Sequence, residues 1–381
     1  MENKEQQYFY SDAGDYKVKF WQPAREFNKY KDELMEAITG CCERGELVLG
    51  FGEQITSFEK NFAEFIGVKH AVMCGSGTQA LCLAYASLGI GPGDEVITTS
   101  HTFIATIDQI ARLGAKPVLV DIGPDGLIDP KLVEEAITEK TKAIVPVHLE
   151  GKVCDMDAIL DIAKRHNLLV IEDAAQAIGA SWEGKRAGSM GNAGCYSFYP
   201  AKVLGCLGNG GAMVTNSDEV AAKARMLRCN SNIGKNSDME AVFGWNLEPD
   251  AIQAAVLNVK LKYLPERLEA RRKLAERYDE AFSDLDILLP VKQAGRVYQD
   301  YVVRMKYPYE RKAFLAHLDS KGIKYLGASL IPNHKYPKLG LECRVPKTEE
   351  YLETQVRLPL NPDLLEEEVA AVIEAVKSFY A

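Results

Sequence analysis

The chain has 381 residues, of which 47% are hydrophobic, with 45 Lys and Arg against 54 Asp and Glu. A formal net charge of -9 argues against a nucleic-acid surface, which needs a basic footprint, and every apolar run is shorter than the roughly 20 residues of a membrane helix. The nine scattered cysteines include no C-x-x-C pair, which predicts reduced thiols and neither a disulfide framework nor a metal site. The chain begins with a polar stretch that has no apolar signal core, so we expect a cytoplasmic protein.

The first part of the chain alternates between short apolar runs and helix-length stretches. Residues 1–18 show no clear period and predict a mobile arm, with packing beginning near Phe20. Strands are expected at 70–74, 95–100, 116–121, 142–148 and 168–173. Helices are expected from Thr78 and at 102–114 and 156–167. This alternation predicts a mostly parallel sheet in an α/β domain.

The pattern changes after about residue 216. Residues 218–228 predict a helix, and 249–285 form a long helical stretch that we expect to be interrupted at Pro265. The remainder mixes short strands with helices and predicts a smaller α+β unit. The expected division is an arm at 1–18, a large α/β domain at 19–250 and a small α+β domain at 251–381.

Two residues predict a cofactor. Lys202 lies between an aromatic-rich strand and two glycine turns, and Asp173 closes an apolar strand. Pyridoxal phosphate (PLP) needs an amine to hold its aldehyde and a carboxylate facing its ring nitrogen. Taken alone, each residue has an ordinary explanation, because most lysines are solvated and an aspartate after a strand often caps the next helix. Together, and with Gln176 near enough to reach the same pocket, they predict a PLP enzyme.

A glycine turn could seat the phosphate. Ser76, Gly77 and Thr78 open an apolar helix, whose N–H groups and dipole favour an anion. Plain helix capping would explain Thr78 but not the two glycines of the turn. Ser197 could add a hydroxyl, and Phe103, at another strand end, could stack on a pyridine ring, although a polar strand residue and core packing would explain them almost as well.

The same turn also fits a dinucleotide fingerprint, G-x-G-x-x-A, and Asp94 and Glu95 follow about 20 residues later. The ribose-binding acid of a Rossmann dehydrogenase belongs at the carboxyl end of the second strand. Asp94 and Glu95 instead precede the predicted strand at 95–100. This placement argues against a nicotinamide site.

Six segments in order resemble the motifs of the DegT/DnrJ/EryC1/StrS sugar aminotransferases, which are fold type I PLP enzymes. The resemblance runs from about Phe20 to the C-terminal helix. The segments are residues 45–81, 91–106, 144–159, 171–180, 197–216 and 244–255.

The resemblance implies a role for each matching residue. Lys202 would hold the cofactor and act as acid and base. The other implied contacts are Asp173 with the ring nitrogen, Gln176 with the ring hydroxyl, Phe103 and Ala175 with the two ring faces, and Ser76, Gly77, Thr78, Ser197 and the partner's Asn246 with the phosphate. The resemblance therefore also implies an obligate homodimer with shared active sites.

The implied activity is amine transfer. L-Glutamate would leave its amino group on the cofactor as pyridoxamine phosphate (PMP) and depart as 2-oxoglutarate, and a keto sugar on a nucleoside diphosphate would take the amine. A 3- or 4-keto-6-deoxy sugar is the expected acceptor, and the product would serve cell-surface glycan or natural-product synthesis. A cyclitol or free keto sugar remains an alternative acceptor. A related dehydratase would carry histidine in place of Lys202, and a non-catalytic PLP-binding regulator would have no reason to keep Lys202, Asp173 and Gln176 together.

The chain departs from the family pattern around the expected substrate. Glu150 replaces a tyrosine, Glu248 an arginine, Gln299 a histidine, and Ala328 and Ser329 a His-Tyr pair; residues 228–232 also differ. We interpret this as an intact cofactor shell and an altered substrate shell. Acids near a diphosphate would repel it unless they face elsewhere, so we expect an unusual keto sugar nucleotide.

Overall fold

The computed structural model of the chain describes residues 16–230, 244–326 and 331–381, so most of the predicted arm, Ser231, Asn232, Ala328 and Ser329 lie outside the described residues. The helices of the described chain are α1 (Pro23–Lys29), α2 (Lys31–Arg44), α3 (Gln54–Ile66), α4 (Gly77–Ser87), α5 (Ala105–Arg112), α6 (Pro130–Glu135), α7 (Met156–His166), α8 (Asp218–Arg228), α9 (Ala251–Phe282), α10 (Arg311–Ser320), α11 (Pro346–Thr354) and α12 (Glu366–Phe379). Its strands are β1 (His70–Cys74), β2 (Glu95–Thr99), β3 (Lys116–Val120), β4 (Thr141–Ile144), β5 (Leu169–Asp173), β6 (Ser181–Trp182), β7 (Lys185–Arg186), β8 (Ala193–Ser197), β9 (Gly211–Thr215), β10 (Ile287–Leu288), β11 (Tyr301–Met305) and β12 (Gln355–Leu358).

A central sheet of seven strands has the order β1-β9-β8-β5-β4-β2-β3. β8, β5, β4, β2 and β3 pair in parallel, while β9 is antiparallel to both β1 and β8. The predicted mostly parallel sheet is therefore confirmed. Because the parallel strands run the same way, the segments that follow them gather at one edge of the sheet, where open α/β sheets bind ligands.

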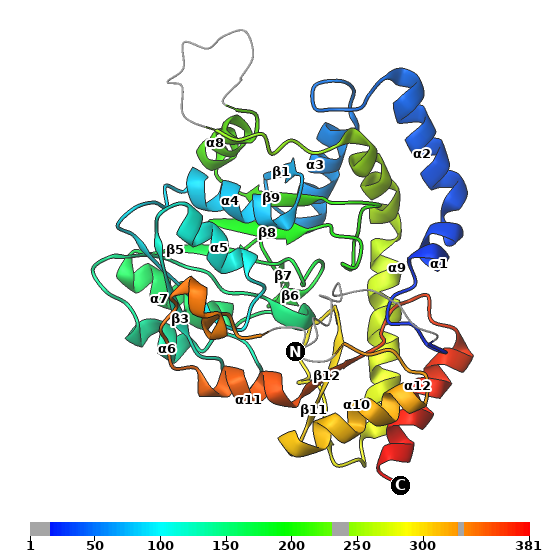
Figure 1. Cartoon of the computed structure of the whole chain (residues 1–381). Coiled ribbons are helices and arrows are strands. Elements are labelled where there is room, and N and C mark those ends of the chain that lie inside the picture. The colour runs from blue at the N-terminus through cyan, green and yellow to red at the C-terminus, as the bar shows by residue number, and fades with distance from the viewer. Residues whose placement is uncertain (1–15, 231–243, 327–330) are drawn as a thin grey trace, which may run out of the picture.

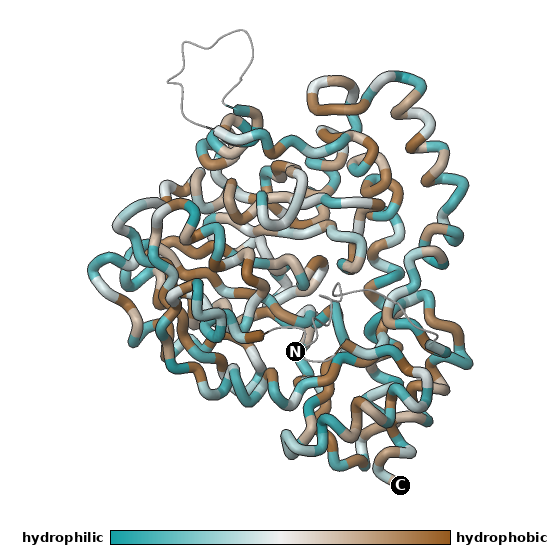
Figure 2. The backbone as a smooth tube through the Cα atoms, viewed as in Figure 1, coloured by the Kyte–Doolittle hydropathy of each residue, from teal (hydrophilic) through white to brown (hydrophobic). Residues whose placement is uncertain are grey.

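Helices cover both faces of this sheet. Successive strand residues point to opposite faces: Val72 and Cys74 pack with α4, α5 and α8, whereas Ala71 and Met73 pack with α3, α7 and the first half of α9. Figure 2 shows hydrophobic residues within the sheet region and hydrophilic residues along the outer helices. The sheet is thus buried on both sides, as its apolar strands require.

A smaller unit follows the central sheet. β10, β11 and β12 form an antiparallel sheet, and α10 and α12 cover it (Figure 1). Val18 is fully buried in this unit and pairs with Ile323, so packing begins slightly before the predicted Phe20. None of the helices in the described ranges has the length and apolar content needed to cross a membrane.

The long helix α9 connects the two parts (Figure 1). Its residues up to Leu268 belong to the core of the large sheet, and those from Leu274 belong to the core of the small one. The prediction that Pro265 interrupts it was wrong, because α9 continues through this residue. Proline removes one helical hydrogen bond, but Leu264 and Leu268 on either side are buried and keep the helix packed. The domain boundary near residue 250 stays a prediction.

Candidate active site

Four of the predicted site residues lie at one edge of the central sheet. Asp173 ends β5, Ser197 ends the neighbouring β8, and Lys202 lies in the loop from β8 to β9. The register places Ser197 opposite Gly211, and Gly211 opposite Cys74, two residues before Ser76. Residues that are far apart in the chain therefore meet where the parallel strands end.

The predicted phosphate turn is tightly packed. Ser76 caps α4, and its hydroxyl accepts a hydrogen bond from the Gln79 N–H at 3.2 Å. A Cβ atom on Gly77 would lie 2.7 Å from Cβ of Ser197, and one on Gly211 would lie 2.3 Å from the Ser76 carbonyl carbon. Both positions need glycine for this close approach. Gly77 and Thr78 lie in the first turn of α4, where N–H groups have no acceptor within the helix and can bind an anion.

The Asp173 carboxylate is buried, with 5% of the residue exposed. It accepts hydrogen bonds from the Thr106 hydroxyl at 2.7 Å and from the Ala175 N–H at 3.2 Å. Burial raises the pKa of Asp173 above its usual range, and the two hydrogen bonds oppose this effect only in part. A buried carboxylate of this kind is suited to a cationic partner, such as a protonated ring nitrogen. Thr106 was not predicted, because it lies in α5 and not in a strand-end motif.

Lys202 is partly buried in its loop. Desolvation lowers the pKa of its amine, while Asp300 and then Asp173 raise it. An amine with a lowered pKa is more often neutral and nucleophilic at neutral pH. Asp300 was missed by the sequence reasoning; it precedes β11, and its carboxylate lies 2.7 Å from the Arg357 guanidinium.

Gln176 and Glu150 are connected directly. The Glu150 N–H donates to the Gln176 side-chain oxygen at 2.9 Å, and Glu150 has a φ of 59°, in the left-handed region. The Glu150 side chain is almost completely buried, with its carboxylate 2.9 Å from the Lys152 amine and 3.0 Å from the Tyr351 hydroxyl. This acid therefore faces into the protein, which removes it as a source of repulsion toward a diphosphate.

The remaining departures from the family pattern have different surroundings. Gln299 is buried, and its amide contacts the backbone of Ala201 and Val203, on either side of Lys202. Arg228 is also buried and binds Glu59 and the Met73 carbonyl. Gln299 and Arg228 thus have structural contacts that explain them without a substrate.

Two predicted contacts and one departure from the family pattern involve accessible residues. Glu248 and Asn246 are exposed, and the Leu247 carbonyl between them accepts a hydrogen bond from the Gly75 N–H at 3.3 Å. Phe103, after β2, is 52% exposed and leaves its ring available to a ligand. Neither Asn246 nor Phe103 is fixed by core packing.

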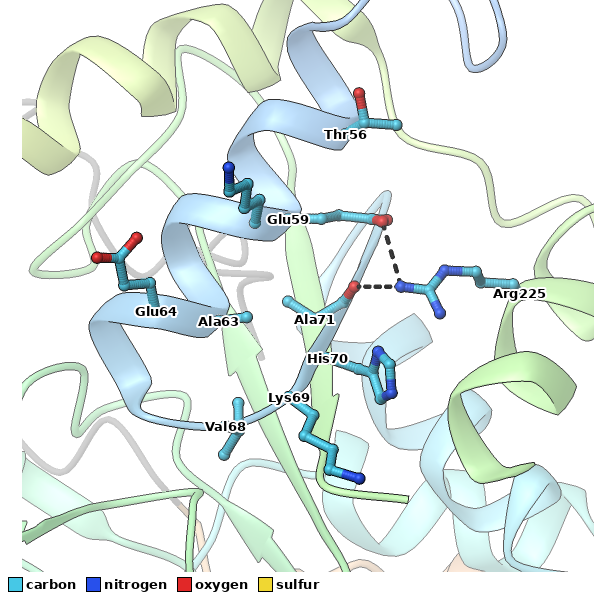
Figure 3. A pocket seen from close by; sticks show the side chains of 10 residues that line it. Thr56, Glu59, Ala63, Glu64, Val68, Lys69, His70, Ala71 and Arg225 are labelled. Atoms are coloured by element: carbon cyan, nitrogen blue, oxygen red, sulfur yellow. Dashed lines mark hydrogen bonds and ion pairs between the residues drawn. The ribbon is translucent and has the colours of Figure 1, made fainter. Parts of the chain in front are cut away.

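A hollow of about 520 Å³ lies elsewhere, between α3, β1 and α8 (Figure 3). Arg225 reaches across it to the Ala71 carbonyl at 3.1 Å and to Glu59 at 3.6 Å, and His70 contacts Asp218 at 2.6 Å. Since His70 starts β1 and the predicted phosphate turn follows the end of this strand, the hollow is separate from the candidate site around Lys202. Of its charged side chains, Arg225 pairs with Glu59, and Lys69 and His70 pair with Asp218.

The donor set at the sheet edge fits PLP. It combines a lysine of lowered pKa, a buried carboxylate and a glycine turn at a helix N-terminus that touches Ser197. Glu95, the rival ribose-binding acid, begins β2 at the opposite end of the strand and pairs with Lys116 at 2.9 Å. The described residues contain no group of three or more His, Cys, Asp or Glu side chains that could hold a metal ion.

Several known proteins resemble this chain over most of their length. The chain is 42% identical over 368 residues to a pleiotropic regulatory protein of Geobacillus stearothermophilus, covering 94% of this chain and 97% of the relative. It is 38% identical over 340 residues to a UDP-2-acetamido-2-deoxy-3-oxo-D-glucuronate aminotransferase of Pseudomonas aeruginosa, covering 88% and 93%. The crystal structure of S. venezuelae DesV in complex with a ketimine intermediate superposes with a TM-score of 0.90 at 37% identity, covering 96% of this chain and 99% of DesV.

The model of the DegT/DnrJ/EryC1/StrS aminotransferase family matches residues 28–377. This match spans both sheets and every described residue of the predicted site. The chain therefore belongs to the DegT/DnrJ/EryC1/StrS aminotransferase family and is a transaminase.

Proposed function

We propose that the enzyme uses PLP to move an amino group from L-glutamate to a keto sugar carried on a nucleoside diphosphate. The observation that supports this most strongly is the gathering of Lys202, Asp173 and the Ser76–Gly77 turn at one sheet edge. Relatives named for such substrates support the sugar part of the proposal, since the Pseudomonas aeruginosa enzyme acts on a UDP-linked 3-oxo sugar. We expect a 3- or 4-keto sugar, most simply a 6-deoxy sugar.

Each residue near the sheet edge would hold a different part of the cofactor. PLP, when bound, supplies an aldehyde and an electron-accepting ring, and PMP is its form after it has taken an amino group. The Lys202 amine would bind the aldehyde carbon, the Asp173 carboxylate would face the ring nitrogen, and Gln176 would contact the ring hydroxyl. The ring would lie between Phe103 and Ala175. Ser76, Gly77, Thr78 and Ser197 would bind the phosphate.

Lys202 also suits proton transfer. Desolvation lowers its pKa, which brings the amine closer to the pH at which a general base works best. Its Nζ atom would take the proton from the amino-acid carbon and later deliver one to the sugar carbon. Asp300 and Asp173 keep the ammonium form accessible by raising the pKa, so that Lys202 can act both as base and as acid.

We infer that the acceptor carries a nucleoside diphosphate and that Glu150 does not oppose its binding. The Glu150 charge is neutralised by Lys152 at 2.9 Å, with Arg296 at 3.7 Å, inside the protein. The remaining acid of the altered set, Glu248, is exposed. Of Glu150 and Glu248, only Glu248 could therefore repel a diphosphate. This weakens the case for an acceptor without a diphosphate, such as a cyclitol or free keto sugar.

We infer further that the active enzyme is a homodimer in the cytoplasm. Asn246 is exposed in the single chain, so its expected phosphate contact is open to a second subunit. Large apolar side chains around the start of α9 are exposed as well: Leu47, Val48, Phe51, Leu207 and Trp245. Two hydrogen bonds join this region, from Ala251 N–H to the Leu47 carbonyl at 3.1 Å and from Leu207 N–H to Gln253 at 3.0 Å. The nine free cysteines suit a reducing compartment.

The deciding experiment is an absorbance titration of the purified protein with L-glutamate. We expect a visible band of lysine-bound PLP, which glutamate replaces by the near-ultraviolet band of PMP in the wild type and not in Lys202→Ala. The PMP form is then mixed with nucleotide-linked keto sugars, free keto sugars and keto cyclitols, and return of the visible band identifies the acceptor. No response to any amino donor would contradict the proposal and favour a PLP-binding regulator.

A further inference from the structure

The loop that carries Lys202 has little regular structure of its own. It runs from Ser197 at the end of β8 to Gly211 at the start of β9, and a hydrogen bond from Cys206 N–H to the Phe198 carbonyl at 2.8 Å closes it. Lys202 N–H donates to the Tyr199 carbonyl at 2.8 Å. The neighbouring residues Ala201 and Val203 are buried, so their backbone groups need partners from elsewhere in the chain.

Gln299 supplies those partners. Its side-chain nitrogen donates to the Ala201 carbonyl at 2.9 Å, and its side-chain oxygen accepts from the Val203 N–H at 3.2 Å. One amide therefore spans the backbone on both sides of Lys202. Since one partner is an acceptor and the other a donor, the contacts also fix which end of the amide is nitrogen.

Gln299 itself is held on a well-anchored segment. The Arg271 guanidinium of α9 donates to the carbonyls of Tyr298 at 3.1 Å and Gln299 at 3.3 Å. A Cβ atom on Gly151 would lie 2.8 Å from the Gln299 nitrogen, so the backbone of residues 298–299 packs directly on this glycine. Gln299 is 5% exposed. Because Gln299 is held rigidly by these contacts, its side chain restrains the Lys202 loop rather than moving with it.

We propose that Gln299 is a positioning residue that holds the Lys202 amine in register with its reaction partner. The proposal rests on the proposed transaminase function and adds a residue that acts through the backbone on either side of Lys202. Gln299 binds and so clamps the backbone of Ala201 and Val203. The small-domain segment before β11 therefore fixes the position of the Lys202 Cα atom, from which the side chain extends. Loss of the clamp would displace the amine while leaving the other cofactor contacts in place.

Two substitutions test whether the hydrogen bonds of Gln299 hold the loop. Gln299→Met keeps the length of the side chain and removes both bonds. Gln299→His is the conservative variant, because a neutral imidazole also carries one donor and one acceptor. Gln293→Met is the matched control: Gln293 likewise bridges a backbone N–H and carbonyl, both of Val153 and both at 2.7 Å, away from Lys202.

The first measurement is hydrogen exchange in the PLP-free protein. We expect the Val203 amide to exchange faster in Gln299→Met than in the wild type, to regain protection in Gln299→His, and to be unchanged in Gln293→Met. This readout needs no activity. If Val203 exchange were the same in Gln299→Met and Gln293→Met, the clamp would not exist, whatever reaction the enzyme performs.

The second measurement is the first half-reaction with L-glutamate. A displacement near 1 Å costs on the order of 10²-fold in rate, so kcat should fall by about 10²-fold in Gln299→Met with KM for glutamate within about threefold of the wild type. Gln299→His should recover to within about tenfold of the wild type. Faster Val203 exchange with an unaltered kcat would overturn the positioning role. An inactive wild type would instead contradict the proposed function, and the exchange result would still decide whether the clamp exists.

Discussion

The Glu150 carboxylate lies 2.9 Å from the Lys152 amine, and both side chains are almost completely buried. Burial alone would raise the pKa of Glu150, but Lys152 and Arg296 lower it to about 2. The same residue presents its N–H to Gln176. The ion pair thus stabilises the backbone on which a predicted cofactor contact depends.

Replacing Glu150 by Gln should lower the free energy of unfolding, because Lys152 would keep a buried charge without its partner. Loss of one member of a buried pair costs about 3–5 kcal/mol. The Glu150 pKa is lowered on folding from 4.5 to about 2, so its contribution is present above the unfolded pKa and is lost as the pH falls through this window. Urea denaturation between neutral and acid pH measures both effects.

The exposed Glu64 provides the control for that experiment. Glu64→Gln should leave stability within about 0.5 kcal/mol of the wild type, as is usual for surface changes. If Glu150→Gln behaved like Glu64→Gln at every pH, the buried pair would contribute nothing to stability.

Asp173→Asn should have opposite effects on stability and on activity. Burial raises the pKa of Asp173 on folding, so the wild-type PLP-free protein loses stability as the pH rises from the unfolded pKa through the folded one. The variant lacks this loss and should melt at a higher temperature at neutral pH. Amine transfer should fall by about 10²–10³-fold, because the side chain proposed to face the ring nitrogen would lose its charge. A less stable PLP-free variant would contradict the first expectation.

Gly77→Ala should weaken cofactor binding. The new Cβ atom would lie 2.7 Å from Cβ of Ser197. Overpacking typically costs about 1–3 kcal/mol, which corresponds to roughly 5- to 150-fold weaker PLP binding. Gly91→Ala is the matched control, since its Cβ atom would find its nearest neighbour, the Leu113 carbonyl oxygen, at 3.9 Å. Fluorescence titration of the PLP-free proteins compares the two affinities. Equal affinities would place the phosphate elsewhere.

Mixed dimers test whether two subunits share each site. Lys202→Ala and Asn246→Asp should each be nearly inactive alone, the second because a carboxylate would repel the phosphate. When the two are refolded together, random pairing should restore about a quarter of wild-type activity, since half of the dimers would contain one intact site of two. No recovery on mixing would show that Lys202 and Asn246 act within the same chain.

Local sequence signals were sufficient to predict which segments meet at the candidate site. An apolar strand ending in Asp173, a glycine turn opening a helix at Ser76, and a loop between two strands around Lys202 are each short patterns, and the structure places all three at one edge of the sheet. The family resemblance, the transaminase activity and the α/β fold type predicted with them are confirmed.

Long-range contacts could not be predicted in this way. Gln299 meets Ala201 and Val203 across 98 and 96 residues of chain, and Glu150 meets Tyr351 across 201. Sequence reasoning assigned Glu150 and Gln299 to the substrate because their types differ from the family pattern. Their protein partners, which lie on other elements, explain them in the structure.

The continuity of α9 has a consequence for how the molecule unfolds. This single helix of 32 residues is packed into both cores. If either core melts, α9 loses part of its packing, and the contacts that it makes with the other core are weakened. We therefore expect one cooperative transition in calorimetry rather than two separate ones, so that the two sheets gain or lose their structure together.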